Sequence, residues 1–116
     1  MNYEQLSTQL KAMSEPNRMK IIDLLSCGEL CACDVLEHFE FSQPTLSHHM
    51  KVLANAQIVD VTKKGQSHFY TLNQEFVASF TNSMQQLFST NQDNCICRSQ
   101  SCLHNGGNQN EKTRVI

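Results

Sequence analysis

The sequence predicts a mainly helical fold with one small β-hairpin. Apolar residues recur at intervals of three and four along most of residues 3–56, which is helical spacing. Segments 58–62 and 68–72 are instead rich in β-branched and aromatic residues, and a short basic stretch lies between them. Helical spacing returns over residues 73–89. The order of these signals predicts four helices, a hairpin and a final helix.

The first two helices are predicted from their apolar spacing and from their end signals. Tyr3–Met13 has the spacing of a single helix. Ser14-Glu15-Pro16 then offers a cap, an acid for a helix N-terminus and a proline suited to a first turn, so a second helix is expected to begin there. Gly28 is expected to end it.

The next two helices form a characteristic pair. Cys31 to Phe39 suits a short third helix, and Ser42 suits the N-cap of a fourth helix that runs to about Ala56. The fourth helix has an apolar stripe made of Leu46, Met50 and Leu53. The opposite face is polar and basic, with Gln43, Ser47, His48 and Lys51, and with Thr45 at its edge. Two short helices joined by a tight turn, the second with a polar face, are the helix-turn-helix pattern.

The predicted hairpin has a basic tip. Its strands are Ile58–Thr62 and His68–Leu72, and Lys63-Lys64-Gly65-Gln66 joins them. A winged helix carries its wing directly after the recognition helix, where the wing can reach the minor groove or the DNA backbone. The sequence therefore predicts a winged helix-turn-helix, followed by a helix over Asn73–Ser89.

Charge is distributed unevenly along the chain. The formal net charge of −2 argues against a generally basic nucleic-acid binder. Residues 1–41 hold seven acids against three bases, whereas residues 42–72 hold three lysines against Asp60 alone. A local positive face of this kind can follow phosphates, weakly and with strong salt dependence. Taken alone, the same lysines also fit an ordinary solvated surface.

The length of 116 residues suits one small domain. We expect it to occupy residues 1–90 and to be followed by a flexible polar tail over residues 91–116. Neither a signal peptide nor a stretch that could span a bilayer can be read in the sequence, so we expect a cytoplasmic protein with no membrane partner. Thiols stay reduced in the cytoplasm, and the six cysteines therefore indicate metal or redox chemistry more than a disulfide framework.

Three blocks of the sequence resemble the signature blocks of a known family. They are Ser14–Met19, Glu29–Leu36 and Ser42–Met50. In this order, with a wing behind them, they look like the arsenical-resistance (ArsR/SmtB) repressors, and most like the arsenic-responsive members. The resemblance implies a homodimer, built on the first and last helices, that binds double-stranded operator DNA of two-fold symmetry and leaves it when an inducer binds. An enzyme is not expected, because no base or oxyanion site is readable around a cysteine nucleophile.

The resemblance also places Cys31 and Cys33 in the inducer-binding block, with As(III) or Sb(III) as the inducer. These soft ions select thiolates, and a trivalent metalloid takes three sulfurs. Residues i and i+2 of an ideal helix point to nearly opposite sides, because each residue turns the chain by about 100°. We therefore expect the start of the third helix to unwind or tighten if both sulfurs are to reach one ion.

The third sulfur must come from elsewhere, because residues 35–37 carry no cysteine where some arsenic sensors have one. The candidates are the tail cysteines Cys95, Cys97 and Cys102, which could also form a separate site, and the local Cys27. We favour Cys95 or Cys97, since Cys27 fits a core position as well as it fits a ligand. The zinc or cobalt site that other members carry on the last helix looks absent here.

The fourth helix and the wing supply the predicted DNA contacts. Base edges or adjacent phosphates are expected to be contacted by Gln43, Thr45, Ser47 and His48. The phosphate backbone is expected to be contacted by Lys51, Lys63 and Lys64. Two alternatives keep the fold and change the signal. One is a thiol-redox switch that uses Cys31 with Cys33 or a tail cysteine, and the other is sensing of cadmium, lead or zinc.

Overall fold

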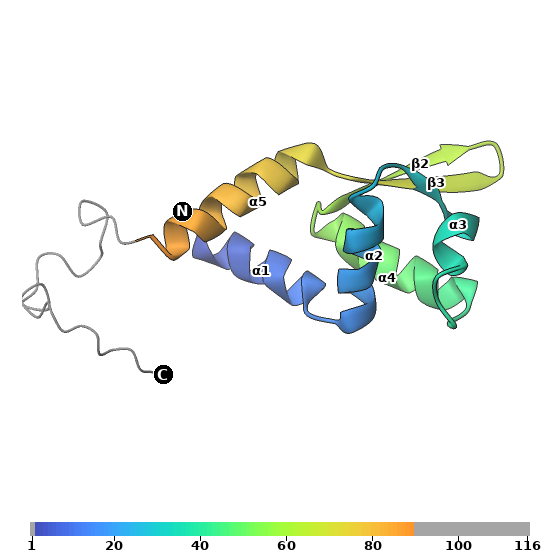
Figure 1. Ribbon diagram of the computed structural model, residues 1–116, viewed down its shortest axis with the longest axis horizontal. Coiled ribbons are helices and arrows are strands. Elements are labelled where there is room, and N and C mark those ends of the chain that lie inside the picture. Colours follow the sequence, from blue (N-terminus) through green and yellow to red (C-terminus); the bar gives the residue numbers. More distant parts are fainter. Residues whose placement is uncertain (1, 90–116) are drawn as a thin grey trace, which may run out of the picture. The chain divides into compact units, whose positions relative to one another are not determined.

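A computed structural model describes residues 2–89 (Figure 1). The helices are α1 (Tyr3–Met13), α2 (Pro16–Leu25), α3 (Ala32–Leu36), α4 (Gln43–Asn55) and α5 (Gln74–Leu87), and the strands are β1 (Leu30–Cys31), β2 (Val59–Lys64) and β3 (Ser67–Leu72). The predicted fold class, mainly helical with a winged helix-turn-helix, is confirmed. Within the described part of the chain, no helix is long and apolar enough to cross a membrane. The boundary expected at residue 90 and the tail beyond it lie outside the described residues.

The first two helices follow the prediction, apart from the residue that caps α2. Glu15 occupies the N-cap position, and its carboxylate accepts a hydrogen bond from the Arg18 backbone N–H at 3.0 Å. Ser14 instead ends α1 as its C-cap, so the prediction that Ser14 caps α2 is wrong. The α2 helix ends at Leu25, and Gly28 follows with φ +130°, a conformation that glycine adopts without strain.

The third helix is shorter than predicted. It covers Ala32–Leu36, whereas the sequence suggested a helix from Cys31 to Phe39. Its Val35 is fully buried, and Phe39 still packs against the core from the loop that follows. The residues immediately before it form β1, a strand of two residues that the sequence did not predict. Such a short strand is defined by pairing with a distant segment, so its own residues give no periodic signal.

The three strands form one antiparallel sheet in the order β1-β3-β2. Strands β2 and β3 form the wing, and their pairing runs from Val59 opposite Leu72 to Lys64 opposite Ser67. The strands are therefore longer than predicted, and the turn consists of Gly65 and the residue after it. Gly65 has φ +63°, which a two-residue hairpin turn commonly requires.

The core lies between the helices and the sheet. Its fully buried side chains are Ile21, Val35, Leu46, Leu53, Ile58 and Val59. The predicted apolar stripe of α4 is confirmed, because Leu46, Met50 and Leu53 are all buried. The α5 helix differs from the others in that none of its residues is buried within its own chain.

Candidate functional site

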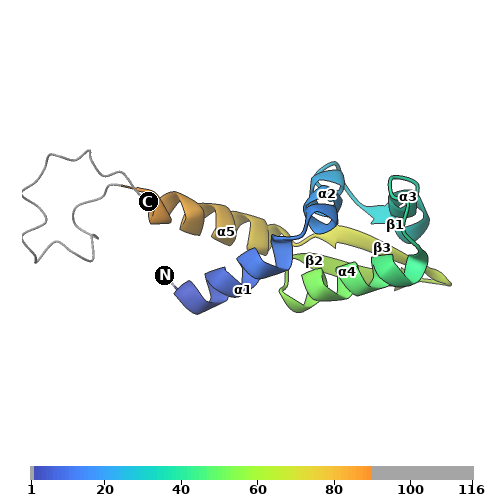
Figure 2. The ribbon, with the colours of Figure 1, turned by 90° about the horizontal axis from the view of Figure 1, so that it is seen from below.

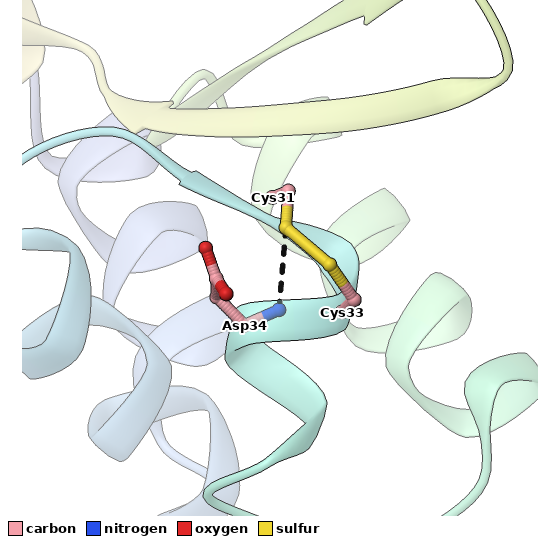
Figure 3. Close-up of a disulfide and its surroundings, with 3 residues drawn as sticks. All are labelled: Cys31, Cys33 and Asp34. Carbon is pink, nitrogen blue, oxygen red and sulfur yellow. Dashed lines mark hydrogen bonds between the residues drawn. A yellow bond between two sulfur atoms is a disulfide. The ribbon is translucent and has the colours of Figure 1, made fainter.

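Cys31 and Cys33 lie together where β1 meets α3 (Figure 3). The structure joins their sulfurs in a disulfide, and their Cα atoms are 5.4 Å apart. Cys31 is half-buried and Cys33 is exposed. The two cysteines predicted to share a ligand are therefore brought into direct contact, at a position that solvent can reach.

The two sulfurs meet because Cys31 is not part of the helix. Its backbone is extended, with φ −81° and ψ 163°, and it is the N-cap of α3. Its sulfur also accepts a hydrogen bond from the Asp34 backbone N–H at 3.3 Å. We expected the start of the third helix to unwind or tighten, and the structure meets that condition, because Cys31 is extended and the helix begins only at Ala32. An extended residue followed by a helical turn already places the two side chains on the same side.

Asp34 is a third possible ligand that the sequence reasoning missed. A carboxylate oxygen of Asp34 and the sulfurs of Cys31 and Cys33 all lie within 4.8 Å of one another. The missed signal was the helix N-terminus itself, where an acid three residues after the cap lies beside the cap residue. A carboxylate is a hard ligand and a thiolate is a soft one, so a soft ion would bind the two sulfurs in preference to Asp34.

The other cysteines are not brought to this pair within residues 2–89. Cys27 is exposed, so the alternative that it belongs to the core is wrong. It is not part of the group formed by Cys31, Cys33 and Asp34. The predicted tail ligands Cys95 and Cys97, together with Cys102, lie outside the described residues.

The predicted DNA-contacting residues of α4 lie on one accessible face. Gln43, Ser47, His48 and Lys51 are exposed, and Thr45 is half-buried. The hydroxyl of Thr45 lies 3.3 Å from the hydroxyl of Ser42, the N-cap residue. This face is opposite the buried stripe of α4, which packs against the rest of the core. The α4 helix can therefore present these side chains without exposing core residues.

His49 is the one buried polar residue of the described chain, at 7 % exposed. Its Nδ1 lies 3.1 Å from Nη1 of Arg18, and Arg18 Nε donates to the backbone oxygen of Ala12 at 2.6 Å. Because a guanidinium only donates, Nδ1 accepts, and the neutral ring carries its proton on Nε2. Burial lowers the pKa of His49, and the positive charges of Arg18 and His48 lower it further, whereas Glu15 acts against them.

His49 is thus a structural residue and does not belong to the face of α4 that is predicted to contact DNA. The sequence contained the necessary signal, because His49 lies three residues after Leu46 and directly before Met50, on the buried side of the helix. Through Arg18, His49 links α4 to α2 and to the last turn of α1.

The two wing lysines differ in their surroundings. Both are exposed. Lys64 forms an ion pair with Glu29 at 3.2 Å, and its Nζ lies 4.7 Å from the centre of the Phe69 ring. Lys63 takes part in no ion pair among the residues that the structure describes.

Figures 1 and 2 show how these parts are arranged. The α3 helix contacts α4, β1 and β3. Cys31 itself pairs with Phe69 of β3, so the cysteine pair adjoins the sheet of the wing and lies at the start of a helix that contacts α4. These elements define a winged helix-turn-helix domain with a pair of cysteines at the start of α3.

The comparisons with known proteins identify the family. Residues 15–61 match the family model described as bacterial regulatory protein, arsR family. Arsenical resistance operon repressors of Staphylococcus xylosus and Staphylococcus aureus are 53 % and 50 % identical to this chain over 98 residues, which is 84 % of this chain and 93 % of each relative. A crystal structure of a possible transcriptional regulator for arsenical resistance is 28 % identical with a TM-score of 0.64, and the match covers 70 % of this chain and 84 % of that one. The chain belongs to the ArsR family of transcriptional regulators.

Proposed function

We propose that the chain is a cytoplasmic, metalloid-responsive repressor that binds a two-fold symmetric operator as a homodimer and is released when As(III) or Sb(III) binds the thiolates of Cys31 and Cys33. The observation that carries this proposal is the convergence of the two sulfurs at the start of α3, a helix that contacts α4. The names of the two staphylococcal relatives support the choice of inducer. No catalytic cofactor is needed for this function.

The chemistry of the site suits a thiophilic ion. As(OH)₃ exchanges each hydroxyl group for a thiolate, so that one As–S bond forms and one water leaves for every thiol that reacts. Two of these bonds are available from Cys31 and Cys33 in their reduced form. Soft ions prefer these sulfurs to the neighbouring carboxylate of Asp34, which favours arsenic or antimony over a harder metal.

The dimer is supported by apolar side chains that residues 2–89 do not cover. Phe76, Phe80 and Met84 of α5 are only half-buried, and Tyr3 and Leu10 of α1 are exposed at 59 % and 39 %. In both views α1 and the first part of α5 lie away from the tip of the wing (Figures 1 and 2). A second copy packed there would cover these side chains and leave α4 and the wing of both copies free to contact DNA.

In this proposal the DNA contacts come from the exposed face of α4 and from the wing. Gln43, Thr45, Ser47 and His48 reach base edges or nearby phosphates in the major groove, and Lys51, Lys63 and Lys64 contact the backbone. A ligand on Cys31 and Cys33 moves the start of α3, and α3 contacts both α4 and β3. The ligand therefore acts on the helix and the wing together.

The test is operator binding by the reduced protein, followed by titration with As(III). We expect a dimer to occupy two half-sites about one helical turn apart. Stoichiometric As(III) binding in calorimetry should accompany release of the operator in fluorescence anisotropy. Failure of reduced protein to bind As(III), or binding without any loss of operator affinity, would show that the inducer is misidentified.

A thiol-redox switch is the second candidate, and the Cys31–Cys33 disulfide favours it. Hydrogen peroxide oxidises the two thiols, so that the O–O bond breaks, the S–S bond forms and the two thiol protons leave in two waters. Peroxide should then release the operator without any metalloid. If peroxide-treated protein stays on the operator but no longer responds to As(III), the disulfide only blocks the inducer site.

The source of the third sulfur is tested by removing the tail. Truncation after Thr90 keeps every described helix and strand, so folding and operator binding should survive. If Cys95 or Cys97 is the third ligand, release should need more As(III), and sulfur coordination measured by X-ray absorption should fall from three towards two. The matched variant is Cys27→Ser. If Cys27→Ser changes both quantities while the truncation changes neither, the preference for a tail cysteine is wrong.

A further inference from the structure

The side chain of Lys64 is engaged by its own chain in the absence of DNA. Its Nζ lies 3.2 Å from Oε1 of Glu29 and also lies over the ring of Phe69. The Glu29–Lys64 pair is the only ion pair within residues 2–89. A carboxylate at this distance occupies one of the three N–H donors of the ammonium group and offsets the positive charge that a DNA phosphate would meet, so it competes with the phosphate for Lys64.

Both contacts of Lys64 adjoin Cys31. Glu29 lies two residues before Cys31, at the entrance to β1. Phe69 is the residue of β3 that pairs with Cys31 across the sheet. Any displacement of Cys31 therefore reaches Lys64 by two short routes, one along the chain and one across the strands.

We propose that Glu29 competes with the DNA phosphate for Lys64, and that this contact transmits the state of the Cys31–Cys33 pair to the wing. The proposal rests on the function proposed above, in which Lys64 contacts the DNA backbone. The side chains of Lys64 and Glu29 are 54 % and 39 % exposed, and such a pair changes an equilibrium by about five-fold at most. It is weak enough for DNA to displace and strong enough to tune affinity.

The first arm of the test uses reduced, ligand-free protein. Glu29→Gln should bind the operator about two- to five-fold more tightly than wild type, since the competing carboxylate is gone. The slope of log affinity against log salt should steepen by up to about 0.9, the contribution of one phosphate contact. Glu37→Gln removes the same charge from an exposed acid that has no ion pair among the described residues, and it should leave the salt slope unchanged.

A double-mutant cycle makes this arm specific. The gain from Glu29→Gln should vanish in a Lys64→Ala background and persist in a Lys63→Ala background, because only Lys64 contacts Glu29. An equal gain in both backgrounds would mean that Glu29 acts through the general field of the protein, and the proposed competition would be wrong.

The second arm measures the ratio of operator affinities without and with As(III), alongside As(III) binding to the free protein. Glu29→Gln should bind As(III) like wild type and show a smaller ratio, whereas Glu37→Gln should keep the wild-type ratio. If Glu29→Gln and wild type bind As(III) equally and show the same ratio of operator affinities, Glu29 does not transmit the state of the cysteine pair to the wing. If wild type binds no As(III), the proposed inducer is at fault, and the same ratio is measured between the reduced and the diamide-oxidised protein.

Discussion

Replacement of both Cys31 and Cys33 by serine is expected to abolish the response to As(III) and to leave operator binding near the wild-type level. Serine at position 31 keeps a good N-cap acceptor for the Asp34 N–H, which the Cys31 sulfur now accepts at 3.3 Å. Position 33 is exposed, so its substitution should affect folding little. Wild type is expected to lose about 5- to 150-fold in operator affinity on binding As(III), the usual range for allosteric coupling. The double variant should lose almost none of its affinity.

The measurement is an As(III) titration of the preformed protein–operator complex, followed by fluorescence anisotropy. Cys27→Ser is the matched control, because Cys27 is another exposed cysteine that lies outside the group around Asp34. It should still respond to As(III), although a shifted midpoint would mark it as the third ligand. If the double variant leaves the operator at the same As(III) concentration as wild type, the residues that bind As(III) lie elsewhere in the chain.

Arg18→Met is expected to cost about 1–3 kcal/mol in the free energy of unfolding. Methionine keeps much of the side-chain volume but removes both donors. It leaves the Ala12 carbonyl and Nδ1 of His49 without the partners that now lie at 2.6 and 3.1 Å. Lys20→Met, on the same helix, breaks an exposed hydrogen bond to the His38 carbonyl and a contact of Nζ with the Phe39 ring. Because both contacts are near the surface, it should change stability less than Arg18→Met does, by about 1 kcal/mol or less. Urea unfolding at one fixed protein concentration measures both.

The burial of His49 beside Arg18 also predicts a dependence of stability on pH. The pKa of His49 is lowered in the folded chain, chiefly by burial, so the unfolded chain binds this proton more readily. The contribution of His49 is therefore complete above pH 6.5, its ordinary pKa, and is lost as the pH falls below that value.

His49→Gln removes the titrating group while its amide oxygen can still accept from Arg18. Between pH 6.5 and 4.5 its unfolding free energy should fall less steeply than that of wild type. Glu15 adds a separate loss only below 4.5, since the bond from the Arg18 N–H lowers the pKa of its carboxyl. Parallel curves for wild type and His49→Gln above pH 4.5 would contradict the assigned role of His49.

The sequence predicted the parts of the fold whose signals are local. The apolar spacing gave α1 its observed bounds, and Ser42 correctly marked the start of α4. The hairpin was found from its β-branched residues, although its strands extend further towards the turn than predicted. What local reasoning could not supply was β1, because two residues become a strand only through their pairing with β3.

The missing strand explains the errors at the candidate site. With β1 unrecognised, Cys31 was assigned to the helix, and the two sulfurs were expected to meet only if the start of that helix unwound or tightened. Family resemblance still selected the two cysteines whose sulfurs the structure brings together. The contact between Glu29 and Lys64 joins residues 35 positions apart, so no local pattern could have indicated it. The burial of His49 was within reach of periodicity, because His49 lies on the same side of the helix as Leu46 and Met50.

The position of the cysteine pair also bears on how such a protein can evolve. Neither Cys31 nor Cys33 belongs to the hydrophobic core, and the residues that pack around α4 do not depend on them. Substitutions outside a core usually change stability by about 0.5 kcal/mol or less. If Cys31 and Cys33 bind the inducer as proposed, descendants of this chain could therefore lose, gain or exchange these side chains in a few steps while the winged-helix scaffold stays intact. Inducer binding and DNA binding could then change separately in evolution, although the residues proposed for them lie in neighbouring elements.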